Sequence, residues 1–299
     1  MLAGLPLRAG LRLADLLLGH LPAPLAYGIA DLGGEAWYRL APVRRELVTE
    51  NMRRVVTATG GRADPRSLRL LVRRAFVEHA RYYLELLRAP HYPPARIDEH
   101  VSVDDWERLE PVLRGGAVIA VPHMGNFEPY GTFVMARGLK AMAPVEEIEP
   151  KELFEFLLSR RGGGRANLIP LSKARRPMIE ALRRGEIVGL IADRDLAGDG
   201  IPVTLFGRPT TMPSGPAAMA ILTGRPLFVA SCLRVGPDRF RASGEVMEAE
   251  RSGDRQADVA ALTQKMATRF EQAIGATPQQ WWGSFQPIWL DQRDGSGAA

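Results

Sequence analysis

The fold of this chain is decided by the stretch AVIAVPHMGNFEPYGTFVMARG at residues 117–138. Ala117–Val121 is a short apolar run that predicts a buried strand. His123 follows almost at once, and Pro129–Arg137 has the pattern of a helix that Gly138 closes. A buried strand, a polar loop and a helix are typical of an α/β sheet, in which reactive groups gather at the carboxyl ends of strands.

The same alternation continues on both sides of this stretch. Short apolar runs bounded by glycine or proline predict strands, and longer amphipathic segments predict helices. We therefore expect an α/β fold in which a mixed central sheet is covered by helices. The expected strands are Ala141–Val145, Asn167–Leu171, Ile187–Ala192, Val203–Phe206, Leu227–Val235 and Arg239–Val246, and the expected helices are Asp104–Leu113, Pro150–Arg161 (closed by Gly162–Gly164), Arg175–Arg184, Ser214–Leu222 and Gln256–Ile274.

The first hundred residues differ from the rest, because their apolar residues recur at helical spacing throughout. Helices are expected at residues 2–18, Ala26–Tyr38, Val43–Val56 and Pro65–Arg88. We interpret residues 1–299 as a single domain. Within it, about residues 1–100 form a helical lid or membrane-facing layer, and about residues 101–290 form the α/β catalytic core.

The charge distribution indicates that the first hundred residues bind an anionic membrane surface. The net charge is +5, and residues 1–100 contain 15 arginines against 10 acidic residues, so they carry all of the excess. Residues 2–18 are amphipathic and leucine-rich, which suits either a membrane interface or packing within the domain. The uncharged run between Asp15 and Asp31 is shorter than the roughly 20 residues of a spanning helix. We expect peripheral attachment at the cytoplasmic face of the plasma membrane.

Several functional classes are disfavoured. No nucleic-acid-binding motif accompanies the arginines, so we expect no nucleic-acid partner. Cys232 is the single cysteine and lies in an apolar run, which makes an intrachain disulfide impossible and a zinc site or a cysteine nucleophile improbable. We expect no metal and no cofactor. The glycine-rich tail, residues 295–299, is expected to be frayed.

The hexapeptide His123–Glu128 carries the expected chemistry. His123 lies just after a strand, and Glu128 lies five residues later in the first turn of the next helix. We expect the Glu128 carboxylate to accept one ring N–H of His123 and leave the other ring nitrogen as a general base. On this pattern alone, a structural histidine is about as plausible. Asn126, inside the hexapeptide, is a candidate substrate-binding residue.

Two further groups of charged residues are candidates for substrate binding. Asp193, Arg194 and Asp195 follow the expected strand Ile187–Ala192, so they could converge on His123; the alternative is a turn stabilised by aspartate side chains. Asp193 is the stronger candidate for supporting His123 or binding sugar hydroxyls. Arg160 and Arg161 could bind a phosphate, or they could simply end an exposed helix.

These segments together resemble the His-x4-Asp/Glu acyltransferases. The resemblance covers about residues 1–290 and is closer to the branch of bacterial lipid A acyltransferases and actinobacterial phosphatidylinositol mannoside acyltransferases. Glu128 departs from the aspartate associated with the mannoside enzymes. Besides the hexapeptide, the matching segments are Ile191–Leu196, Val203–Pro209 with Met212–Gly215, Gln280–Trp282 and Gln286–Trp289.

The resemblance implies a glycerolipid acyltransferase-like fold and a membrane-associated O-acyltransferase. The expected donor is acyl-CoA, with palmitoyl-CoA preferred, and the expected acceptor is a mannose of a phosphatidylinositol mannoside. His123 would act as the base and Glu128 would orient it. The alternatives are a lipid A-type acyltransferase, a thioesterase in which His123 activates water, and a non-catalytic lipid-binding protein. The sequence leaves the oligomeric state open.

Overall fold

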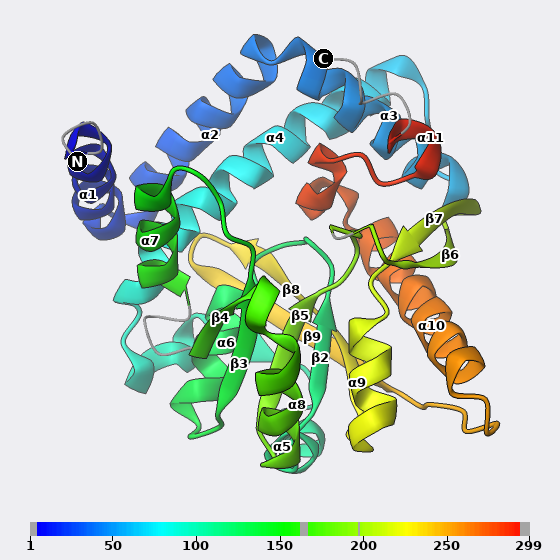
Figure 1. The fold of residues 1–299 in the computed structure, drawn as a ribbon. Coiled ribbons are helices and arrows are strands. Elements are labelled where there is room, and N and C mark those ends of the chain that lie inside the picture. The colour runs from blue at the N-terminus through cyan, green and yellow to red at the C-terminus, as the bar shows by residue number, and fades with distance from the viewer. Residues whose placement is uncertain (1–4, 162–166, 197, 294–299) are drawn as a thin grey trace.

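The computed structural model describes residues 5–161, 167–196 and 198–293. Its centre is a seven-stranded sheet in the order β1-β9-β8-β2-β5-β3-β4, in which only β8 and β9 are antiparallel neighbours (Figure 1). The α/β fold with a mixed central sheet is thus confirmed. The strands are β1 (Val101–Val103), β2 (Val118–Val121), β3 (Ala141–Val145), β4 (Asn167–Pro170), β5 (Ile187–Ile191), β8 (Leu227–Gly236) and β9 (Arg239–Met247).

Helices cover both faces of the sheet, because successive residues of a strand point to opposite sides. Val118 and Val188 pack in a core with α8, α9 and α10, whereas Ile119 and Ile187 pack in a second core with α5 and α6. Because these strands are buried on both faces, their sequences are unbroken apolar runs. The helices of the core region are α5 (Trp106–Arg114), α6 (Glu128–Ala136), α7 (Lys151–Arg160), α8 (Arg175–Arg183), α9 (Gly215–Thr223) and α10 (Arg255–Ala276).

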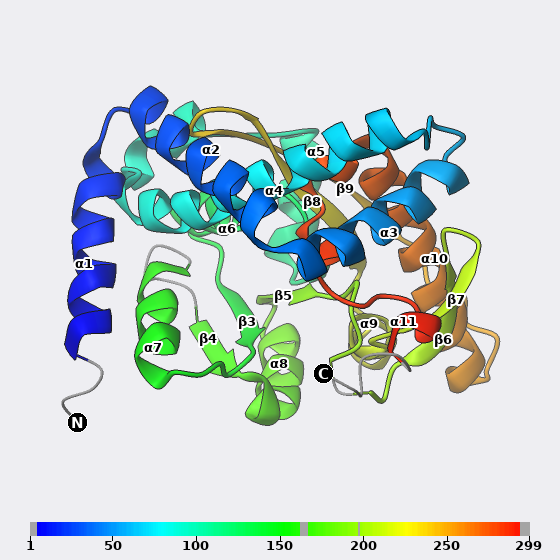
Figure 2. The same cartoon turned by 90° about the horizontal axis from the view of Figure 1, so that it is seen from above.

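The expected N-terminal helical layer is present. It consists of α1 (Leu5–His20), α2 (Ala23–Leu40), α3 (Pro42–Ala58) and α4 (Pro65–Arg88), which agree with the four expected helices within a few residues. Residues 2–4 of the first expected helix lie outside the described residues. Viewed from above, α2 and α4 cross one end of the sheet, and α1 stands at the edge of the molecule (Figure 2).

The connecting segments contain short 3-10 turns. Two of them, η1 (Ala89–His91) and η2 (Pro94–Glu99), lead from α4 into β1. The turn η4 (Leu171–Lys173) follows β4, and the chain ends with η5 (Pro278–Gln280), η6 (Trp282–Phe285) and α11 (Leu290–Arg293).

The structure differs from expectation in three strands, β6, β7 and β1. The expected strand Val203–Phe206 is β6 (Ile201–Leu205), which pairs with β7 (Arg208–Met212) in a separate antiparallel hairpin rather than in the central sheet. Phe206 and Gly207 both have positive φ, which suits a two-residue hairpin turn. Strand β1 was not expected, because three residues are too few to show a period. The glycines 162–164, expected to close a helix, lie outside the described residues.

The loop after β2 is held between β8 and the C-terminal segment. Gly125 donates its N–H to the Gln280 carbonyl oxygen, and Met124 forms a bridge with Trp281. Gly125 has a φ of 56°, and a Cβ there would lie 2.0 Å from the Cys232 carbonyl oxygen. Only glycine fits this position, and so the hexapeptide backbone is fixed against the sheet.

None of the helices in the described part of the chain is long and apolar enough to cross a membrane.

Candidate active site

The site is built around His123 and Asp193, which lie side by side at the carboxyl ends of neighbouring strands. Strands β2 and β5 are parallel, with Val121 opposite Ile191, so the residues two positions further along are also neighbours. His123 Nδ1 lies 2.5 Å from Asp193 Oδ1. Because a carboxylate accepts at Nδ1, the proton is assigned to Nδ1 and the Nε2 lone pair is left as a base.

Asp193 is held in its ionised form. It is only 2% exposed, and its Oδ2 accepts a hydrogen bond of 2.8 Å from Trp281 Nε1. Burial by itself raises the pKa of the carboxyl group. The electrostatic attraction between Asp193 and His123 and the hydrogen bonds from His123 and Trp281 outweigh burial, so the pKa of Asp193 lies below its usual value. An ionised Asp193 can stabilise the imidazolium that forms when His123 takes a proton.

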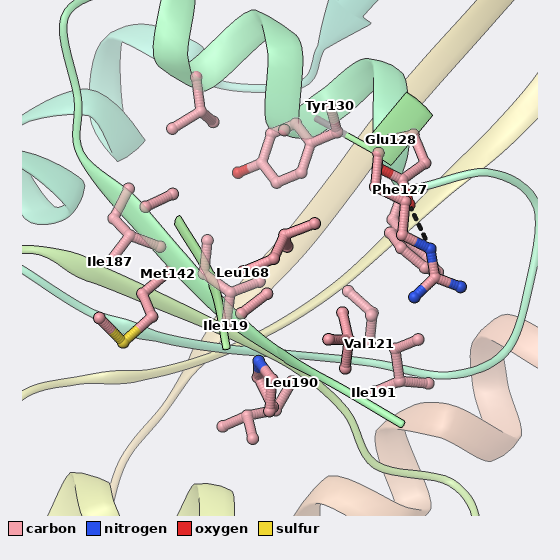
Figure 3. Close-up of a pocket in the computed structure, with 18 of the residues that line it drawn as sticks. Ile119, Val121, Phe127, Glu128, Tyr130, Met142, Leu168, Ile187, Leu190 and Ile191 are labelled. Atoms are coloured by element: carbon pink, nitrogen blue, oxygen red, sulfur yellow. Dashed lines mark ion pairs between the residues drawn. The ribbon is translucent and has the colours of Figure 1, made fainter. Parts of the chain in front are cut away.

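The expected role of Glu128 as the orienting carboxylate is wrong. Its Oε1 lies 3.5 Å from the guanidinium of Arg161, whereas the ring N–H of His123 faces Asp193. Glu128 is the first residue of α6, and its backbone N–H donates to Asn126 Oδ1. This start of the helix directs the carboxylate toward Arg161, and the dashed line at Glu128 in Figure 3 marks their ion pair. Proximity in sequence therefore suggested a contact that the helix geometry does not make.

Asn126 does not offer its side chain to a substrate, contrary to expectation. It is fully buried, and both of its polar atoms are engaged within the protein. Nδ2 donates to Glu85 Oε2 at 3.0 Å, and Oδ1 accepts the N–H of Glu128 at 3.0 Å. Asn126 thus supports the turn between His123 and α6.

A buried ionic cluster connects this turn to the helical layer. Arg234 of β8 contacts both Glu78 and Glu85 of α4, and all three side chains are buried. Glu85 Oε1 also accepts the hydroxyl of Tyr27 from α2 at 2.8 Å. No sequence pattern predicted this cluster, because Arg234 and Glu85 lie 149 residues apart.

Trp282 forms one wall beside the base. Its ring meets the His123 ring edge to face, with 4.6 Å between centroids, and its Nε1 donates to the Gly125 carbonyl oxygen. His79 stacks on the same indole, and burial lowers the pKa of His79 to about 3, so this histidine is neutral. The only sequence signal for these contacts is the pair of consecutive tryptophans at 281 and 282, and it did not predict that they lie beside His123 and Asp193.

The two remaining candidates after β5 have structural partners. Asp195 accepts the N–H groups of Gly198 and Gly200 and the hydroxyl of Thr211, so it stabilises a turn and does not converge on His123. Arg194 lies 3.2 Å from Glu146. Of the three residues from 193 to 195, only Asp193 reaches His123.

Arg160 and Arg161 diverge. Arg160 pairs with Asp15 of α1 at 2.9 Å, which ties α7 to the helical layer. Arg161 pairs with Glu128 and lines an apolar cavity, so it is the arginine of this pair that borders the site.

This cavity lies beside Glu128 and between α6 and the sheet. Its volume is about 130 Å³, and its walls come from β2, β3 and β5 on one side and from α6 on the other (Figure 3). Apart from Glu128 and Arg161, the lining is almost entirely apolar. The principal side chains are Ile119, Val121, Tyr130, Val134, Met142, Leu168, Ile187 and Ile191.

Within the described residues, no group of three or more His, Cys, Asp or Glu side chains is arranged to hold a metal ion. Cys232 is buried in β8, as expected, and burial raises the pKa of its thiol. A thiol in this state is a poor nucleophile. The base therefore has no cysteine nucleophile to activate.

Known proteins are similar in sequence to this chain over most of its length. The model of the family described as bacterial lipid A biosynthesis acyltransferase matches residues 12–292. A phosphatidylinositol mannoside acyltransferase of Mycolicibacterium smegmatis is 30% identical over 89% of this chain and 93% of its own length. A protein of the same name from Mycobacterium tuberculosis is 34% identical over 71% of this chain and 68% of its own length.

The matched region contains the strand-end histidine, its carboxylate partner, the apolar cavity and the C-terminal tryptophans. An acyltransferase needs a base for the acceptor and an apolar site for the acyl chain. The chain is therefore an acyltransferase that belongs to the bacterial lipid A biosynthesis acyltransferase family.

Proposed function

We propose that this protein transfers a fatty-acyl chain from acyl-CoA to a sugar hydroxyl of a glycolipid, and that the sugar is a mannose of a phosphatidylinositol mannoside. The names of the two mycobacterial relatives support this acceptor. The observation that carries the proposal is the His123–Asp193 pair next to an apolar cavity.

The chemistry follows from the atoms that face the site. His123 Nε2 takes the proton of the acceptor hydroxyl while that oxygen attacks the thioester carbonyl carbon. The tetrahedral intermediate collapses, the C–S bond breaks, and the sulfur leaves with the bonding electron pair. A thiol pKa of about 8.5 makes CoA thiolate a good leaving group. Asp193 stabilises the imidazolium until its proton passes to the thiolate or to water.

The apolar cavity is the proposed site of the donor acyl chain. Its walls can accept a hydrocarbon but offer few hydrogen-bonding groups. Glu128 and Arg161 form the polar end of the cavity. The cavity also reaches Val121 and Ile191, which precede His123 and Asp193 by two residues each. Arg161 is the candidate for binding a phosphate of the donor or of the acceptor.

We further propose peripheral attachment at the cytoplasmic face of the plasma membrane. The helical layer carries the excess positive charge and several large apolar side chains that are exposed. Such a combination favours an anionic lipid surface. The exposed side chains are Leu13, Leu16 and Leu17 of α1 and Leu25, Ile29 and Leu32 of α2.

An acceptor comparison tests the proposal. The purified protein is given palmitoyl-CoA with a phosphatidylinositol mannoside, with a lipid A precursor, or with no acceptor, and lipid products are measured by mass spectrometry. We expect acylated mannoside and little free fatty acid. Preferential acylation of the lipid A precursor would assign a lipid A-type enzyme. CoA release without acceptor would assign a thioesterase, and acyl-CoA binding without turnover would assign a lipid-binding protein.

A further inference from the structure

Two glycines line the proposed acyl cavity from opposite walls. Gly131 belongs to α6, and Gly189 belongs to β5. A Cβ built on either residue has no heavy atom within 4 Å, so each faces open space inside the molecule. The space that a side chain would fill at each position therefore belongs to the cavity.

The fold itself does not require glycine at these two positions. Neither residue has the left-handed backbone that favours glycine, in contrast to Gly125. Glycine within a helix or a strand is destabilising relative to alanine. On β5, Gly189 also leaves a gap between Ile187 and Ile191, which point to the same face of the sheet. The feature that the two glycines share is the cavity.

The two glycines lie at different depths. Gly189 precedes Asp193 by four residues, which is about 13 Å along an extended strand. Gly131 follows Glu128 by three residues, which is about 4.5 Å along the axis of α6. Gly131 lies at the start of α6 beside Glu128, whereas Gly189 lies opposite Ile119, two residues inside the strand ends Val121 and Ile191. A chain that enters beside Glu128 would therefore meet Gly131 before Gly189.

We propose that Gly131 and Gly189 determine donor specificity. Gly131 keeps the entrance wide enough for any acyl chain, and Gly189 provides the deeper space that a long chain needs. The inference rests on the proposed function, because it assumes that the cavity holds the acyl chain of the donor.

The test compares palmitoyl-CoA with octanoyl-CoA at saturating acceptor, using kcat/KM for each donor. In Gly189→Val, we expect the palmitoyl-to-octanoyl ratio to fall by about tenfold or more, because a single methylene in an apolar pocket has an effect of this size. Octanoyl transfer should be retained. Gly131→Leu should lower kcat/KM for both donors. All variants should keep the melting temperature of the parent protein or exceed it.

The control is Gly28→Ala. Gly28 is an exposed glycine of α2 whose Cβ would also meet nothing within 4 Å, but it does not line the cavity. This variant should keep the parent ratio. If Gly189→Val fails to fold, Gly189→Ala should still shift the ratio in the same direction by a smaller factor.

An unchanged ratio in folded Gly189→Val would overturn the inference while leaving the proposed function intact. Failure of both Gly189 variants to fold would also overturn it, because the space for a side chain would not exist. Absence of acyl transfer by the parent protein would instead overturn the proposed function.

Discussion

Replacing Asp193 by Asn removes one charge and changes the shape of the site very little. In the parent protein, the Asp193 carboxylate accepts hydrogen bonds from His123 Nδ1 and Trp281 Nε1. An asparagine offers only one acceptor atom in place of two, and its amide group would face one of these donors with its own N–H. The replacement should make the orientation of His123 less well defined and its protonated form less stable.

The expected size of the effect comes from the roles of the carboxylate. In the serine protease triad, the equivalent replacement lowers kcat by about 10⁴-fold, which is about 5 kcal/mol in activation free energy. The structure places Asp193 in the same relation to its imidazole. The free energy of unfolding should fall by only about 1–3 kcal/mol, which is the cost of one unsatisfied buried polar group.

The assay is the initial rate of acyl transfer, measured alongside thermal unfolding. Asp195→Asn is the matched control, because Asp195 lies two residues away but stabilises a turn. The control should keep most of the activity. If folded Asp193→Asn retained more than a tenth of the parent rate, Asp193 could not be the residue that orients His123 and stabilises its protonated form.

Three further predictions concern stability and membrane binding. Arg234→Met should lower the free energy of unfolding, measured in urea, by about 3–5 kcal/mol, because it leaves two buried glutamates without their cation. Arg241→Met, at an exposed ion pair, should leave the free energy of unfolding nearly unchanged. Asp238 lies between β8 and β9 and accepts hydrogen bonds from Arg88 and Tyr92. Burial raises the pKa of Asp193 and Asp238, but their hydrogen bonds and the electrostatic attraction to their neighbours outweigh burial and lower both pKa values. Their stabilisation should therefore be complete above about pH 3.9 and be lost as the pH falls below it through the folded-state pKa values, which urea unfolding at several pH values can detect. The protein should sediment with anionic liposomes and be released by high salt, and Leu32→Glu should weaken binding while Val235→Glu, on β8, should not; equal weakening by both would argue against the helical layer as the membrane surface.

Local structure was predictable because it depends on nearby residues. The expected helix Pro65–Arg88 and strand Ala141–Val145 coincide with α4 and β3, since their apolar patterns are long or sharply bounded. The separate hairpin of β6 and β7 was missed, because a short apolar run does not reveal its pairing partner.

The site was predictable only in part. The rule that reactive groups gather at strand ends correctly brought Asp193 toward His123, because it depends on sheet topology. The assignment of Glu128 as the orienting carboxylate failed, because the first turn of α6 turns its side chain toward Arg161. The cluster around Arg234 depends on contacts between distant segments, for which one sequence offers no signal.

The central claim is that His123, oriented by Asp193, activates an acceptor hydroxyl for direct attack on the thioester. No cysteine is placed to carry the acyl group, so donor and acceptor should meet in one ternary complex. Double-reciprocal plots of initial rate against donor concentration, at several fixed acceptor concentrations, should therefore give intersecting lines. Cys232→Ala should keep nearly full activity.

The most direct measurement is acyl transfer by His123→Ala, with circular dichroism to verify the fold and mass spectrometry to follow both the lipid product and the protein. A general base contributes roughly 100- to 10,000-fold, so we expect the rate to fall by at least that lower factor, and no acyl-protein adduct in the parent enzyme. A folded His123→Ala variant that kept more than half of the activity would contradict the account, as would a trapped acyl-protein adduct that transfers its acyl group to the acceptor.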